Sequence, residues 1–99
     1  MQKGIYTITE ISRYLSPIAR RHGLGAAFVF GSYARGDATA QSDVDICIEK
    51  GRVKTLFELS GIRLDFEEAL GKRVDLVTTD SLRGTFKTEV EKERVAIYD

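Results

Sequence analysis

The residues best suited to chemistry are a Gly-Ser pair and two aspartates separated by one residue. Gly31-Ser32 follows a short apolar run, ten residues intervene, and Asp43-Val44-Asp45 opens the next apolar segment. Glycine lets the backbone approach a phosphate closely, and Ser32 with nearby backbone N–H groups can donate hydrogen bonds to phosphate oxygens. The Gly-Ser segment is therefore predicted to hold a triphosphate.

The two aspartates predict a metal site. Residues 43–49 alternate in polarity, which predicts a strand with Asp43 and Asp45 on one face. Adjacent carboxylates repel each other unless a cation neutralises them, and Mg²⁺ prefers such hard oxygen ligands. One cysteine and one histidine cannot build a tetrahedral structural zinc site. Magnesium is therefore the expected cofactor.

A third aspartate, Asp75, lies in residues 73–79, another strand candidate. If this strand lies beside the 43–49 strand, Asp75 joins the cluster as a further metal ligand or as the base that takes the proton of an acceptor hydroxyl. Such a set suffices for phosphoryl transfer, which needs mainly positioning and charge neutralisation. The simpler alternative is that Gly31-Ser32 is only a turn and Asp75 a solvated strand position.

Three basic residues near this set each admit two explanations. Arg35 can steady triphosphate oxygens or form a surface salt bridge, and it is retained as a nucleotide-binding candidate. Lys72 and Arg73 could attract phosphate, but a solvated surface pair is the expected arrangement.

The elements that position these residues can be placed from apolar periodicity and capping signals. Thr7 and Glu10 form a capping box that predicts a helix ending near Gly23, and Pro17 makes this helix either kinked or broken into two. The remaining predicted elements are a buried strand at 26–30, a helix at 53–70 ending at Gly71, a helix at 85–93 and a short apolar end at 95–98. This order predicts an α+β fold with helices packed against a sheet.

Size and charge limit the possible classes. The 99 residues suffice for a single domain, predicted to span 1–99. Fifteen basic and fifteen acidic residues cancel, so no overall positive field favours nucleic acid, and direct nucleic-acid binding is not expected. The N-terminus has no signal-peptide pattern, and no apolar run approaches the roughly 20 residues that span a bilayer. A cytoplasmic protein without membrane contact is expected.

Residues 30–37 (FGSYARGD) and 42–45 (SDVD) together resemble the signature of the minimal nucleotidyltransferases of the DNA polymerase beta-like superfamily. The N-terminal helix, the 74–77 strand and the 93–98 ending follow in that family's order, so the resemblance covers nearly the whole chain. It implies a small mixed β-sheet with the polymerase beta-like nucleotidyltransferase core.

The resemblance also implies roles for the residues above. Gly31 and Ser32 match the family's triphosphate-binding turn, and Asp43, Asp45 and Asp75 match its catalytic, magnesium-binding aspartates.

The family further implies a partner. Small members are often MntA-type antitoxins of HEPN/MNT toxin–antitoxin modules, and some transfer AMP from ATP to a tyrosine of the HEPN ribonuclease toxin. The same chemistry could use another NTP. The chain has little length left after building the catalytic sheet, so we expect a partner to supply the acceptor. Two alternatives remain: a binding-only antitoxin that acts by occlusion, and a nucleotidyltransferase that acts on a small molecule or RNA.

Overall fold

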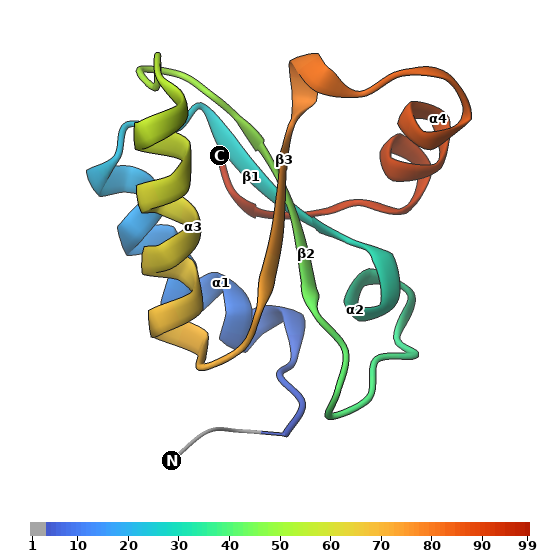
Figure 1. The fold of residues 1–99 in the computed structure, drawn as a ribbon. Coiled ribbons are helices and arrows are strands. Elements are labelled where there is room, and N and C mark those ends of the chain that lie inside the picture. Colours follow the sequence, from blue (N-terminus) through green and yellow to red (C-terminus); the bar gives the residue numbers. More distant parts are fainter. Residues whose placement is uncertain (1–3) are drawn as a thin grey trace.

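Short apolar segments form the strands of a mixed sheet in the computed structural model, which describes residues 4–99. These strands are β1 (Ala26–Phe30), β2 (Val44–Glu49), β3 (Val74–Thr78) and β4 (Val95–Tyr98). Their order across the sheet is β3-β2-β1-β4, with β2 antiparallel to β1 and parallel to β3 (Figure 1). The apolar C-terminal end is thus an edge strand, which pairs antiparallel with β1.

Capping residues determine where the two long helices begin. The predicted capping box of Thr7 and Glu10 opens α1 (Ile8–Arg21). A second capping box, formed by Thr55 and Glu58, opens α3 (Leu56–Leu70), so this helix begins three residues later than predicted. Two shorter helices complete the fold, α2 (Gly31–Arg35) and α4 (Gly84–Glu93), with a 3₁₀ turn at Thr79–Ser81.

Helix α1 continues through Pro17 and is not divided into two helices. Pro17 is exposed, so the carbonyl that loses its usual N–H partner is on the side that water can reach. The core residues on either side of it, Leu15 and Ile18, are buried in the same cluster and hold both halves of the helix against the sheet. After α1 the chain turns at Gly23, which has a φ of 72°.

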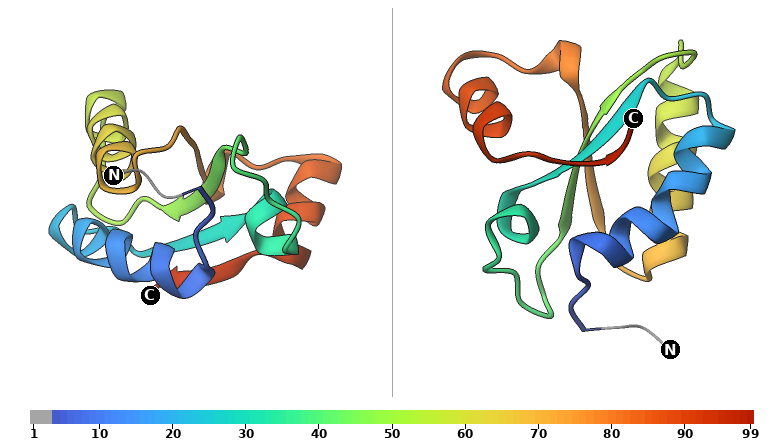
Figure 2. Two further views of the ribbon diagram at one scale, coloured as in Figure 1. Left: turned by 90° about the horizontal axis from the view of Figure 1, so that it is seen from below. Right: turned by 180° about the vertical axis from the view of Figure 1, so that it is seen from behind.

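Alternation along the strands sorts side chains onto the two faces of the sheet. Val44, Ile46 and Ile48 join the main core with residues of α1 and α3. On the opposite face, Cys47 packs with a smaller cluster that includes Val90 of α4. Figure 2 shows α1 and α3 together and α2 and α4 at the other end of the sheet. Nowhere in residues 4–99 does a helix reach the length and apolar character required to cross a membrane.

Lys72 is buried, which corrects the expectation of a solvated basic pair. Its side chain is only 8% exposed, and its ammonium nitrogen donates a hydrogen bond of 2.9 Å to the carbonyl oxygen of Ala40. Burial of an ammonium group is tolerated when a hydrogen-bond acceptor is present. Lys72 therefore ties the turn before β3 to the loop between α2 and β2. Arg73 beside it is exposed, as expected.

Candidate active site

The parallel pairing of β2 and β3 brings two of the candidate aspartates together. Asp45 is the direct register partner of Asp75, and both lie near the beginning of their strands. Directly opposed residues in a parallel pair lie on the same face, here the face that also carries Cys47 and Val77. Asp45 is half-buried and Asp75 is exposed.

Gly31 lies against Asp45 because Phe30, the residue before it, pairs with Asp45 across β1 and β2. A methyl group added to Gly31 would lie 2.1 Å from the Oδ2 atom of Asp45, and Gly31 has a φ of +72°, which disfavours other residues. Only glycine therefore lets the carboxylate approach the backbone here. Ser32 follows in the first turn of α2 and is half-buried.

Asp43 lies one residue before β2 instead of inside it, and its side chain is exposed. Its charge nevertheless acts on Asp45. Burial, and after it the negative charges of Asp75 and Asp43, raises the pKa of Asp45 to about 6, against an opposing contribution from Arg35. The predicted carboxylate cluster is therefore an electrostatic unit formed by one half-buried group and two more solvated ones.

This cluster has the right donor chemistry for a divalent cation. Within residues 4–99, no three acidic, histidine or cysteine side chains are grouped tightly enough to hold a metal as they stand. The mutual repulsion that raises the pKa of Asp45 is what a bound cation would relieve, and carboxylate oxygens are suitable ligands for it. The oxygen donors of these residues therefore suit a hard divalent metal.

The raised pKa of Asp45 predicts that Asp45→Asn stabilises the metal-free protein at pH 7.5. The pKa of this carboxyl is about 4 in the unfolded chain and about 6 in the folded one, so the folded protein loses stability as the pH increases across that interval. Because the group is partly solvated, we expect a gain of about 1 kcal/mol, or about 5 °C in Tm.

Thermal unfolding in a chelating buffer at pH 4 and pH 7.5 tests this effect. The stabilisation should be present at pH 7.5 and nearly absent at pH 4. Asp80→Asn is the control, since hydrogen bonds from Thr78 and Lys50 lower the pKa of Asp80 and its replacement should bring no gain. Equal melting temperatures of wild type and Asp45→Asn at pH 7.5 would contradict the electrostatic assignment.

Glu93, the last residue of α4, is a site residue that sequence reasoning missed. Its Oε1 atom accepts a hydrogen bond of 2.8 Å from the N–H of Gly31. The guanidinium of Arg35 lies 3.4 Å from the other carboxylate oxygen of Glu93 and 3.4 Å from Asp37. The bonds to Glu93 and then the charge of Asp37 raise the pKa of Arg35. No motif links Glu93 to Gly31, since 62 residues separate them.

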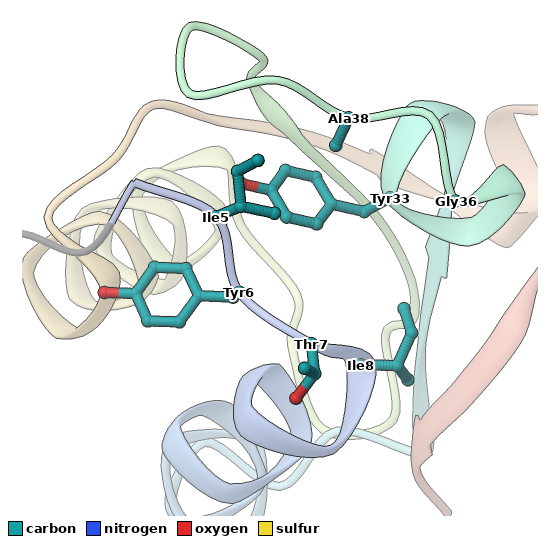
Figure 3. Close-up of a pocket in the computed structure, with 7 residues that line it drawn as sticks. All are labelled: Ile5, Tyr6, Thr7, Ile8, Tyr33, Gly36 and Ala38. Carbon is teal, nitrogen blue, oxygen red and sulfur yellow. The ribbon is translucent and has the colours of Figure 1, made fainter.

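Two hollows flank α2. An open cleft of about 450 Å³ between α2 and α4 is lined by Arg35, Glu89, Lys92 and Glu93. A second pocket, of about 230 Å³, lies between α2 and the segment that leads into α1 (Figure 3). Tyr33 reaches from α2 over this second pocket, and its buried hydroxyl has no hydrogen-bond partner among the described residues. The first cleft shares Arg35 and Glu93 with the site.

The sheet with its Gly-Ser turn and strand aspartates is the architecture of a nucleotidyltransferase catalytic domain. Residues 11–97 match the nucleotidyltransferase domain family, and the chain belongs to this family. This confirms the resemblance recognised in the sequence. Nucleotidyltransferases of this kind generally use a divalent metal.

Two sequence relatives extend over almost the entire chain. The protein MJ0435 of Methanocaldococcus jannaschii, named as a candidate protein adenylyltransferase, is 40% identical over 90 residues, which are 91% of this chain and 97% of the relative. The protein adenylyltransferase MntA of Thermococcus cleftensis is 35% identical over 98 residues, covering 95% of this chain and 99% of the relative.

Solved structures confirm the predicted fold class. A structure described as a candidate minimal nucleotidyltransferase superimposes with a TM-score of 0.79 at 28% identity, covering 94% of this chain and 98% of the other. A toxin–antitoxin structure with AMP-PNP superimposes with a TM-score of 0.76 over 87% of this chain and 71% of the other. At 22% identity, the second likeness concerns the fold alone.

Proposed function

We propose that this protein is a magnesium-dependent adenylyltransferase that moves AMP from ATP to a hydroxyl group of a partner protein. The observation that carries the proposal is the pairing of Asp45 with Asp75 beside the close approach of Gly31 to Asp45. It joins the carboxylates and the phosphate-binding turn within one small region. The names of the two relatives both contain the words protein adenylyltransferase, which supports AMP as the transferred group and a protein as the acceptor.

Each proposed residue has a defined task. Asp43, Asp45 and Asp75 would hold Mg²⁺, which would supply charge neutralisation on the phosphates. Gly31, Ser32 and Arg35 bind the triphosphate through a backbone N–H, a hydroxyl and a guanidinium. Together these groups orient the α-phosphate toward the open face that Asp75 borders, where an acceptor can approach.

The reaction balances as a simple displacement. The acceptor oxygen forms a bond to the α-phosphorus of ATP, the bond from that phosphorus to the β-phosphate oxygen breaks, and pyrophosphate leaves. The acceptor's proton passes to a carboxylate or to water. Asp75, which is the exposed member of the strand pair, is the suitable base if it is not fully engaged as a metal ligand.

The resemblance to MntA-type antitoxins extends the proposal to the partner. We infer that the acceptor is a tyrosine of a HEPN ribonuclease toxin and that the transferred AMP inactivates it. The relative in Thermococcus cleftensis, which carries the name protein adenylyltransferase MntA, supports this inference. Here the partner supplies the acceptor group.

Calorimetry tests the nucleotide and metal site itself. Magnesium-dependent binding of ATP should weaken more than about 100-fold in Asp43→Ala/Asp45→Ala, because direct metal ligands are lost. The control Asp80→Ala/Asp99→Ala removes two exposed charges outside the cluster and should bind as wild type does. Undiminished magnesium-dependent binding by the first double variant would refute the proposed site.

A further inference from the structure

The carboxylate of Glu93 accepts hydrogen bonds from Gly31 and Arg35, the groups that bind the triphosphate in the proposed function. The backbone N–H of Gly31 donates to its Oε1 atom at 2.8 Å. The Nη1 atom of Arg35 lies 3.5 Å from the same oxygen and 3.4 Å from the other. The Glu93 side chain is only 24% exposed, so this contact lies at the edge of the site and not free in solvent.

A carboxylate and a phosphate compete for such donors because both are anions that accept hydrogen bonds through oxygen. Gly31, which donates to Glu93, also lies against the carboxylate of Asp45, so Glu93 stands close to the carboxylate cluster. A triphosphate placed on Gly31 and Arg35 would meet Glu93 at short distance, with like charges on both sides. The contacts of Glu93 and those of the nucleotide therefore exclude each other.

We propose that Glu93 is an internal substitute for a phosphate group: it holds Gly31 and Arg35 in the nucleotide-free protein and is displaced when the triphosphate binds. The inference rests on the proposed function, since it assigns Gly31 and Arg35 to the nucleotide. The open cleft of about 450 Å³ next to Glu93 provides space into which the side chain can turn.

The position of Glu93 gives its displacement a structural consequence. It is the last residue of α4, and Arg94, the next residue, stacks on the ring of Phe28 with its guanidinium carbon 4.2 Å from the ring centroid. Strand β4 begins immediately afterwards and pairs with β1. Nucleotide binding is therefore coupled to the junction between α4 and β4, which borders the cleft.

Calorimetric titration with magnesium and a non-hydrolysable ATP analogue tests the displacement. Glu93→Gln keeps the shape of the side chain but removes its charge, so the analogue should bind about five- to tenfold more tightly than to wild type. Glu89→Gln removes one negative charge from the same cleft one helical turn earlier and measures the general electrostatic gain, which should be less than about twofold. Unchanged or weaker binding by Glu93→Gln would overturn the proposal and leave Glu93 as a residue that only orients Arg35.

The experiment separates this inference from the proposed function through Asp45→Asn. If Asp45→Asn loses magnesium-dependent binding while Glu93→Gln shows no gain, the site is right and the displacement is wrong. If Asp45→Asn binds the analogue with magnesium as tightly as wild type does, the proposed site is wrong, and the displacement of Glu93 is wrong with it.

A second measurement does not depend on any variant being folded. In the wild-type protein, NMR should show the side-chain carboxylate carbon of Glu93 and the amide of Gly31 both shifting when the analogue is added. A Glu93 carboxylate signal that stays unchanged at saturating analogue would overturn the proposal.

Discussion

Asp45→Asn is expected to lower the rate of AMP transfer by about 10³-fold or more, whereas Ser32→Ala is expected to lower it by about 10²-fold. The difference follows from the kind of contact each side chain makes. The carboxylate of Asp45 lies against Gly31, and in the proposed site it bonds directly to the metal. In the proposed site the hydroxyl of Ser32 is one of several donors to the phosphates, and the backbone N–H groups around it remain when it is removed.

Pyrophosphate release with the purified acceptor protein, saturating magnesium and saturating ATP measures this comparison. Saturation is needed because a loss of affinity alone would otherwise be counted as a loss of rate. Both variants must also unfold at temperatures at or above that of the wild type, which the stabilisation expected for metal-free Asp45→Asn makes easy to satisfy. An equal or larger loss for Ser32→Ala would reverse the two assignments.

The effects expected for Asp45→Asn on stability and on rate have opposite signs. Burial and the charges of Asp75 and Asp43 raise the pKa of Asp45 to about 6, so its charged form destabilises the metal-free fold. Repulsion between the carboxylates destabilises the protein while no cation is bound, and binding of a cation would relieve it. A surface aspartate such as Asp80, held by Thr78 and Lys50, has no such conflict.

Local patterns in the sequence predicted the strands that carry the site. Alternating apolar residues located β2 and β3, and the condition that these strands lie side by side is met by the register of Asp45 with Asp75. The capping box of Thr7 and Glu10 located the start of α1. These features depend on residues a few positions apart, so they can be recognised without knowledge of the fold.

Features that depend on contacts between distant residues could not be predicted in this way. Glu93 reaches Gly31 across 62 positions, and its place in a charged helix gave it no distinguishing pattern. Lys72 is buried because the carbonyl of Ala40 accepts its hydrogen bond, a partner 32 positions away. Helix α1 continues through Pro17 because packing of Leu15 and Ile18 outweighs the local cost of proline.

The largest expected effect in the partner is the covalent addition of AMP to a tyrosine hydroxyl of a HEPN toxin. The residues proposed to bind the nucleotide and the metal lie at the beginning of β2 and β3 and at α2, and Asp75 among them is exposed, so an acceptor can approach it. In-line transfer requires that the acceptor tyrosine attack the α-phosphate from the side opposite the leaving pyrophosphate.

Intact-mass and peptide mass spectrometry test this prediction. A candidate HEPN toxin from the same organism is incubated with the protein, magnesium and ATP, and its ribonuclease activity is assayed in the same samples. We expect one or more added AMP groups on tyrosine and a matching loss of ribonuclease activity with the wild-type protein. Asp43→Asn/Asp45→Asn should give neither, although it keeps the size and shape of both side chains. If the toxin is neutralised without modification, and the double variant protects equally well, the protein acts by occlusion and the catalytic proposal fails.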